Sequence, residues 1–151
     1  MGGLQSSRLG KKQMPDKDAR NATNPGSEAA DHRATILLVD DNNDVREITA
    51  ILLNDLGYTV IEAESGQAVL AQLESGTTAD LLMVDFAMPG MSGLETVTKA
   101  RIKWPALKIL FVTGYADNPQ MSNLFQGEAV IKKPFSVSDL ETAINQALAR
   151  P

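Results

Sequence analysis

The sequence predicts an α/β fold in which helices cover both faces of a parallel β-sheet. Apolar stretches that read as strands alternate along the chain with segments whose apolar residues recur every three or four positions. Two of the strand stretches, 36–39 and 81–84, are apolar at every position, which is typical of strands buried on both faces. Gly, Ser or Pro marks many of the boundaries between them.

The first two strand–helix pairs occupy residues 35–76. "TILLVD" (35–40) and "YTVIEA" (58–63) read as strands. The first helix has cap candidates at 42–44 and a stop signal at Gly57, and its apolar residues recur at helical spacing: Val45, Ile48, Leu52 and Leu56. "SGQAVLAQLESG" (65–76) is a second, shorter helix between a Ser start and a Gly end.

Three further strand–helix pairs follow. The predicted strands are "DLLMVD" (80–85), "LKILFVT" (107–113) and "AVIKK" (129–133). The third helix, 92–104, opens with a Ser92–Glu95 capping box and stops at Pro105. The fourth, within 118–127, is short and weak. The last, 136–150, is amphipathic, with one apolar face formed by Leu140, Ile144 and Leu148.

Composition limits the classes of function. One domain is the expectation for 151 residues. Of the 14 basic and 19 acidic residues, six and four lie in residues 1–34, so eight basic and fifteen acidic residues remain in the rest of the chain. An acidic body argues against nucleic-acid binding. There is no cysteine, no apolar stretch long enough to span a membrane and no signal-peptide core, so we expect a cytoplasmic protein.

Residues 1–34 contain no Ile, Val, Phe, Trp or Tyr and are rich in polar residues. Such a segment buries too little apolar surface to offset its ordering entropy, so we expect a disordered tail or linker before a domain at 35–150. Its opening, "MGGLQS", matches the permissive myristoylation pattern. The single histidine, His32, lies in this tail, and we interpret it as a solvated side chain.

The carboxyl ends of the predicted strands carry the candidate functional residues. In open parallel sheets, ligands bind outside these ends, where the strand order reverses. The residues there are Asp40, Asp41, Asp85, Thr113 and Lys133. The second strand ends near Glu62 and Glu64, but we expect it at an edge of the sheet, away from the crevice.

The chemistry of this set indicates a magnesium-dependent phosphoryl site. Asp40, Asp41 and Asp85 cannot all stay ionised at close range without a cation, and an all-oxygen acidic cluster suits Mg²⁺. The ammonium group of Lys133 and the hydroxyl of Thr113 suit phosphoryl oxygens. An Asp carboxylate can itself be the nucleophile and form an aspartyl-phosphate.

Four motifs resemble those of a known family: "ILLVDDN" (36–42), "LLMVDFAMPGMSGLE" (81–95), "ILFVTGYA" (109–116) and "IKKPF" (131–135). Over residues 35–150 the chain resembles the receiver domain of response regulators in two-component phosphorelay signalling. The resemblance implies a flavodoxin-like (βα)5 doubly wound sheet with strand order 2-1-3-4-5. It also implies a conformational switch that catalyses only its own phosphorylation and dephosphorylation, with no output domain in this chain.

The resemblance assigns a role to each residue of the set. Asp85 accepts a phosphoryl group from a histidine kinase or a histidine phosphotransfer protein. Asp41 binds Mg²⁺ directly and Asp40 mainly through water, while Asp85 and the backbone carbonyl of Ala87 complete the protein ligands. Thr113 follows the phosphoryl group and Lys133 contacts it. The bond between Lys133 and Pro134 is usually cis in the family, and the downstream target is expected to bind the fourth helix, fifth strand and fifth helix.

The chain departs from the family pattern at one position. Members that switch by rotating an aromatic side chain carry Phe or Tyr three residues before the Lys, where this chain has Val130. Its "VTGYA" loop instead resembles a subgroup without that aromatic residue, often attached to hybrid sensor kinases. We therefore expect the readout to pass through residues 114–127, mobile before phosphorylation and more ordered after it.

Other functions remain to be weighed. The chain can be a stand-alone regulator or the receiver fragment of a hybrid histidine kinase. An Asp-nucleophile phosphatase of the dehalogenase type would need a second Asp where this chain has Ala87. A flavin or nucleotide binder would need a Gly- or Ser/Thr-rich phosphate loop where this chain has "DDNND". A degenerate receiver would not be expected to keep all five site residues.

Overall fold

The computed structural model describes residues 33–114, 119, 122–125 and 127–150. The chain divides into two units at Arg33–Ala34, and the elements below all belong to the second. The strands are β1 (Thr35–Val39), β2 (Thr59–Ala63), β3 (Leu81–Asp85), β4 (Lys108–Thr113) and β5 (Ala129–Lys132). The helices are α2 (Asn43–Asp55), α3 (Gly66–Glu74), α4 (Gly93–Lys103) and α5 (Val137–Ala149), together with a 3-10 helix, η1 (Ser122–Phe125).

The five strands form one parallel sheet in the order β2-β1-β3-β4-β5. This confirms the predicted fold class and the position of β2 at an edge. The strand order reverses between β1 and β3, because β1 pairs with β2 on one side and with β3 on the other. The crevice predicted to hold the site therefore opens above the carboxyl ends of β1 and β3.

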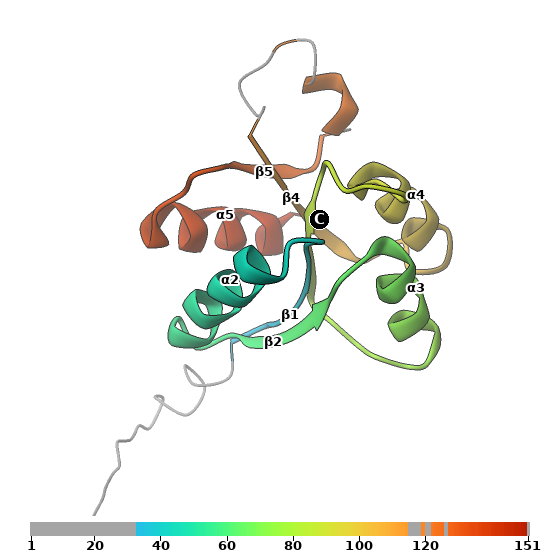
Figure 1. Cartoon of the computed structure of the whole chain (residues 1–151), viewed down its shortest axis with the longest axis horizontal. Helices are drawn as coiled ribbons and strands as arrows, with labels where there is room; N and C mark the ends of the chain where they lie inside the picture. The colour runs from blue at the N-terminus through green and yellow to red at the C-terminus, as the bar shows by residue number, and fades with distance from the viewer. Residues whose placement is uncertain (1–32, 115–118, 120–121, 126, 151) are drawn as a thin grey trace, which may run out of the picture. The chain divides into compact units, whose positions relative to one another are not determined.

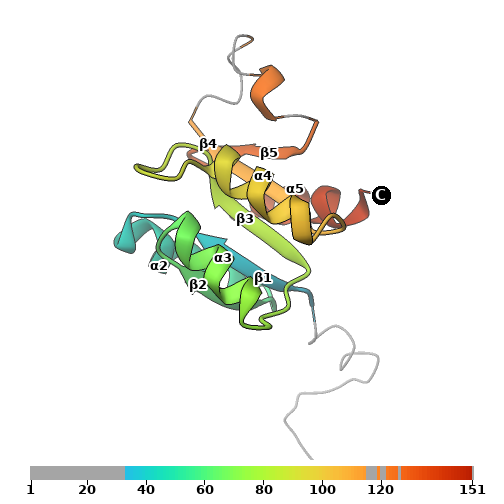
Figure 2. The same cartoon turned by 90° about the vertical axis from the view of Figure 1, so that its right-hand side faces the viewer.

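Helices cover both faces of the sheet, with α2 and α5 on one side and α3 and α4 on the other (Figure 1). Successive side chains of a strand point to opposite faces, so each central strand contributes to two cores. Ile36 and Leu38 of β1 pack in the core under α2 and α5, whereas Leu37 and Val39 pack in the core under α3 and α4. Figure 2 shows α3 and α4 in front of the sheet, over the face that they cover.

Local capping signals determine where the helices begin. Asn42, Ser65, Ser92 and Ser136 each have extended backbone, and each side chain accepts a hydrogen bond from the backbone N–H three residues later. The predicted capping box at Ser92 differs in one half, because the Glu95 carboxylate pairs with Lys99 at 3.5 Å. Both halves of a capping box are instead present between Ser136 and Asp139.

The face of α2 that is buried against the sheet differs from the apolar stripe that the sequence predicts. Its buried residues are Thr49, Ala50 and Leu53, whereas Val45 and Ile48 are 37% and 60% exposed. Helical spacing gives the period of an apolar stripe, but which side of the stripe faces the sheet depends on how the helix packs. The outer side of this stripe borders a cavity beside the strand ends, described below.

The short helix predicted within residues 118–127 is present only as the 3-10 helix η1. Its Phe125 is buried in the core under α3 and α4. Residues 115–118, 120–121 and 126, half of the segment 114–127 that was predicted to be mobile, lie outside the described residues. So do residues 1–32, which include all but two residues of the predicted tail (1–34), the "MGGLQS" opening and His32. Among the described residues, no helix combines the length and apolar character needed to cross a bilayer.

Candidate functional site

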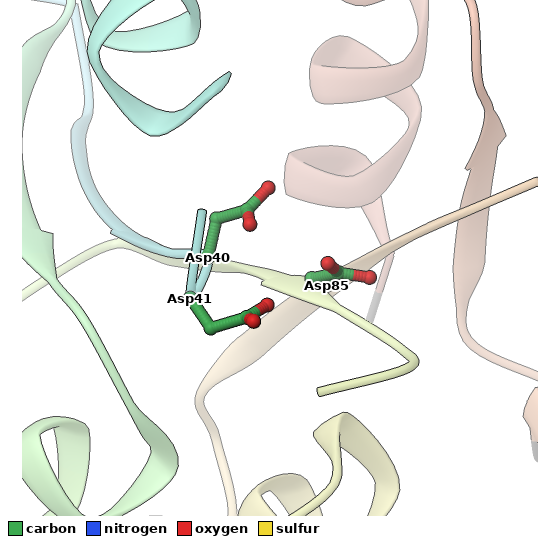
Figure 3. A group of neighbouring side chains, drawn as sticks. All are labelled: Asp40, Asp41 and Asp85. Carbon is green, nitrogen blue, oxygen red and sulfur yellow. The ribbon is translucent and has the colours of Figure 1, made fainter. Parts of the chain in front are cut away.

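The structure brings the three predicted carboxylates together at the carboxyl ends of β1 and β3. Asp40 and Asp41 follow β1 directly, and Asp85 is the last residue of β3 (Figure 3). One carboxylate oxygen from each residue lies within 4.8 Å of the other two. Asp40 and Asp85 are buried, with 6% and 9% of their surface exposed, whereas Asp41 is exposed to solvent.

Lys133 approaches the cluster from the end of β5. Its Nζ lies 3.6 Å from Oδ2 of Asp85 and 3.8 Å from Oδ2 of Asp40. Its backbone N–H donates to the carbonyl of Thr113 (2.9 Å), and the Lys133–Pro134 peptide bond is cis, as the resemblance implied. The neighbouring Lys132 is exposed and lies opposite Thr113 in the β4–β5 register.

Thr113 ends β4, the strand between those that carry Asp85 and Lys133. It is buried, with 2% of its surface exposed. The structure therefore places all five predicted site residues at the same end of the sheet. Glu64 also follows its strand, β2, at that end, but on the edge of the sheet as expected.

Burial raises the pKa of the Asp85 carboxyl group, and the negative charges of Asp40 and Asp41 act in the same direction. The Lys133 ammonium opposes this rise, as does the N–H of Ala87, which donates to Oδ1 of Asp85 (3.2 Å). The first effect is the loss of hydration of the ionised carboxylate. Ionisation of Asp85 therefore costs more here than in a solvent-exposed Asp, and added positive charge at this site would stabilise the ionised form.

The start of α4 lies directly against the backbone of Asp85. The Gly93 N–H donates to the carbonyl of Phe86 (3.0 Å), and the Phe86 N–H donates to Val112 of β4 (2.9 Å). A Cβ atom on Gly93 would come within 2.3 Å of the Asp85 carbonyl oxygen. Glycine at this position therefore allows the helix to begin in contact with the end of β3.

The composition of the cluster fits a divalent cation of the magnesium type. Every side-chain donor is a carboxylate oxygen, the ligand type that suits Mg²⁺, and two of the three carboxylates are buried close together. Such a group of like charges is costly unless a cation binds between them. Ala87, whose carbonyl was assigned as a further ligand by the resemblance, is exposed two residues after Asp85.

A cavity of about 470 Å³ opens beside the cluster, between α2 and the chain that leads into α5. Asp40, Asp85 and Lys133 line its polar end. The rest of its wall is mainly apolar and includes Val45 and Ile48, two of the exposed apolar residues of α2. Asp85 can thus be approached from solvent on this side of the sheet.

Sequence reasoning missed one residue that contacts the site. Arg46, in the first turn of α2, donates to the backbone carbonyl of Asp40 (2.7 Å) and pairs with Glu62 at the end of β2 (3.1 Å). Glu62 was expected away from the crevice, but Arg46 links it to the Asp40 backbone. A signal was present in the sequence: an Arg in the first turn of a helix opposes the helix dipole, so it usually needs a specific partner.

Comparisons with known proteins agree with this arrangement. The family model described as the response regulator receiver domain matches residues 36–145. The chain is 35% identical over 116 residues to the response regulator receiver protein CpdR of Brucella abortus, covering 75% of this chain and 95% of CpdR. Its structure is similar to that of response regulator protein TrrA from Thermotoga maritima in complex with Mg²⁺-BeF (TM-score 0.68, 30% identity, covering 76% of this chain and 99% of TrrA).

Similarity also extends to longer proteins. The chain is 36% identical over 120 residues to the sensor kinase CckA of Brucella abortus, covering 78% of this chain. It spans between 13% and 31% of the length of three such longer relatives. The fold, the family model and these relatives lead to one conclusion: the chain belongs to the response regulator receiver domains, the signalling switches of two-component systems.

Proposed function

We propose that this receiver domain is phosphorylated on Asp85 in a Mg²⁺-dependent reaction and acts as a switch in a phosphorelay. The observation that supports this proposal most directly is the convergence of Asp40, Asp41 and Asp85 within 4.8 Å, with the Lys133 ammonium beside Asp85. A carboxylate can act as the nucleophile in phosphoryl transfer, and the neighbouring ammonium can stabilise the charge that develops there.

In this proposal Asp41 and Asp85 hold Mg²⁺ with the carbonyl of Ala87, and Asp40 holds it mainly through water. When bound, Mg²⁺ offsets the negative charge of the carboxylates and of the phosphoryl group that approaches them. The N–H of Ala87 orients Asp85 through Oδ1, which turns Oδ2 toward Lys133. The residues of this chain thus orient the acceptor before the donor arrives.

The proposed transfer step is a displacement at phosphorus. Oδ2 of Asp85 forms the new O–P bond while the N–P bond of a phosphohistidine breaks, and the bonding pair stays on the imidazole nitrogen, which then takes up a proton. Lys133 binds one phosphoryl oxygen and the Thr113 hydroxyl donates to another. Hydrolysis of the acyl phosphate by water reverses the switch, so the chemistry is confined to its own phosphorylation and dephosphorylation.

The readout in this proposal does not use a rotating aromatic side chain, because Val130 occupies that position and packs partly buried against the core. In this proposal the chain belongs to the subgroup with a "TGY" loop. Phe86, which follows Asp85 in the chain, has its ring centroid 4.9 Å from that of Phe125 in η1. This contact connects the acceptor loop to the surface formed by η1, β5 and α5, which we propose as the face for a downstream protein.

The proposed biological setting follows the same reasoning. Residues 1–34 form a tail or linker, and residues 35–150 form the receiver domain. The phosphodonor is a histidine kinase or a histidine phosphotransfer protein in the cytoplasm, and the acidic surface does not serve nucleic acid or membrane. The match to CckA supports the alternative that the chain is the receiver fragment of a hybrid kinase.

Acetyl phosphate with Mg²⁺ tests the acceptor. Intact-mass spectrometry should show one added phosphoryl group on the wild type, none on Asp85→Asn, and one on His32→Ala as the matched control. The product should release phosphate at alkaline pH or with hydroxylamine, as an acyl phosphate does. Labelling that persists in Asp85→Asn would refute the assignment of Asp85.

Magnesium binding is tested separately, without phosphorylation. Trp104 precedes β4 and lies at the opposite end of the sheet, so its fluorescence is a poor reporter. Calorimetry or NMR should show Mg²⁺ binding at millimolar concentration or tighter, and Asp41→Asn should weaken it strongly. If no Mg²⁺-dependent change occurs at residues 40, 41 and 85, the proposed metal site is wrong.

A further inference from the structure

We propose that Arg46 is a positioning residue for the metal ligands, and that Glu62 enables it to act without repelling the cation. This proposal rests on the Mg²⁺-dependent function proposed above. Arg46 is not placed against the phosphoryl group, the metal or a carboxylate of the site. It holds the backbone that carries two of those carboxylates.

The guanidinium group of Arg46 has a partner at each of its three nitrogens. Nη1 donates to the backbone carbonyl of Asp40 (2.7 Å), Nε donates to Oε1 of Glu62 (3.1 Å), and Nη2 donates to Oδ1 of Asn43 (2.7 Å). Only 15% of the side-chain surface is exposed. A planar fork with all three nitrogens in use has little freedom to rotate, so its donors point in defined directions.

The carbonyl that Arg46 holds belongs to the peptide between Asp40 and Asp41. Because a peptide unit is planar, a hydrogen bond to the carbonyl oxygen of Asp40 also orients the N–H and Cα of Asp41. The Asp40 carboxylate has other restraints, namely the N–H of Asn42 (2.9 Å) and the ammonium of Lys133 (3.8 Å). Asp41 is exposed, so control of its backbone is a direct way to aim its carboxylate.

Glu62 resolves an electrostatic conflict. A guanidinium group close to a cation site would oppose metal binding if its charge were uncompensated. The Glu62 carboxylate pairs with it, and the Glu62 backbone carbonyl is held by the side chain of Gln72 (3.1 Å), which ties the end of β2 to α3. The pair can therefore donate a strong hydrogen bond to Asp40 while contributing little net charge.

Arg101 offers a matched control within the same chain. Its Nε donates to the backbone carbonyl of Leu107 (3.0 Å), and its Nη2 pairs with Glu128 (2.9 Å). This is the same combination of one carbonyl and one carboxylate, but at the start of β4, the opposite end of the sheet. A role that is only structural predicts similar behaviour for the two arginines, whereas a positioning role separates them.

The experiment compares Mg²⁺ binding by calorimetry in the wild type, Arg46→Gln, Arg101→Gln and Glu62→Gln. Loss of a residue that orients metal ligands typically lowers metal affinity about 10- to 100-fold, so Arg46→Gln should raise the Mg²⁺ Kd by about tenfold or more. Arg101→Gln should lower thermal stability and leave Kd unchanged. Glu62→Gln should raise Kd less than Arg46→Gln does, because the carbonyl bond remains.

A second readout uses the metal-free protein. The amide ¹⁵N shift of Asp41 reports on the hydrogen bond to the preceding carbonyl, so in EDTA it should move in Arg46→Gln and stay in Arg101→Gln. If Arg46→Gln fails to fold, Arg46→Lys keeps the charge without the fork and should give the same changes to a smaller degree.

The outcomes separate the two proposals. If the wild type binds Mg²⁺ and Asp41→Asn does not, but the Arg46 variants bind like the wild type, the positioning role is wrong and the proposed function stands. If neither the wild type nor Asp41→Asn shows Mg²⁺ binding, the proposed metal site fails and the role of Arg46 fails with it.

Discussion

Lys133 reaches across β4 to place its ammonium nitrogen 3.6 Å from Oδ2 of Asp85. The two residues end strands that are not neighbours, since β4 separates β3 from β5. The position of Lys133 is defined by its backbone bond to Thr113 of that intervening strand. The relationship therefore depends on three strands ending at the same level, and it determines how charge at Asp85 is balanced.

The raised pKa of Asp85 predicts a gain in stability when its charge is removed. Burial, the first cause, raises this pKa above the 3.8 of an isolated Asp side chain, so the folded protein binds the proton more tightly than the unfolded chain. The stability contributed by protonated Asp85 is full below that value and is lost as pH rises through the folded pKa. In EDTA at pH near 7, Asp85→Asn should therefore have the higher Tm.

The pH series is the control for this prediction. The difference in Tm between Asp85→Asn and the wild type should shrink as pH falls through the folded pKa and reach its minimum below 3.8, where the carboxyl group is protonated in both states of the wild type. Added Mg²⁺ should raise the Tm of the wild type more than that of the variant. A variant less stable than the wild type in EDTA at neutral pH would contradict the prediction.

Lys133→Ala should separate metal binding from phosphoryl transfer. Removing the ammonium takes away positive charge near Asp40 and Asp85, so Mg²⁺ should bind at least as tightly as in the wild type. Phosphorylation by acetyl phosphate should slow by about 100-fold, the effect of removing one donor to a developing charge. Lys132→Ala makes the same charge change one residue earlier and should retain the rate. Equal rates in the two variants would argue against Lys133 as the phosphoryl contact.

Gly93→Ala should disturb the acceptor, because the new Cβ atom would meet the Asp85 carbonyl oxygen at 2.3 Å. Relieving this overlap requires a shift of α4 or of the β3 end, at a cost of about 1–3 kcal/mol. Gly114→Ala is the matched change, since nothing lies within 4 Å of its added Cβ, and it should stay within about 0.5 kcal/mol. Urea denaturation measures both, and similar losses would contradict the close approach of α4.

Phe125→Ala should show that η1 is anchored by aromatic packing. The Phe125 ring centroid lies 4.9 Å from that of Phe86 and 5.9 Å from that of Phe111. Truncation of a buried Phe typically costs about 3–5 kcal/mol. Leu124→Ala, at a neighbouring position with 41% exposure, should cost no more than about 0.5 kcal/mol. Comparable values from denaturation of the two variants would mean that η1 does not depend on the Phe cluster.

The sequence by itself determined the order, type and approximate ends of most elements. These features follow from interactions within a few residues, such as the side-chain caps at Asn42 and Ser65 and the fully apolar stretches of β1 and β3. Alternation of strands and helices then implies a parallel sheet, and a parallel sheet places all strand ends on one side. That is why Asp40, Asp85 and Lys133 can be grouped from the sequence alone.

Only the tertiary structure decided how far side chains reach and which backbone they touch. Arg46 contacts the carbonyl of Asp40 and the carboxylate of Glu62 because β2 pairs with β1. That pairing depends on how the whole sheet buries its apolar faces. The same holds for the buried face of α2 and for the contact of Gly93 with the Asp85 backbone. Local signals act over a few residues, whereas these contacts depend on how elements distant in sequence pack together, so a local pattern can indicate that Arg46 needs a partner but cannot identify which one.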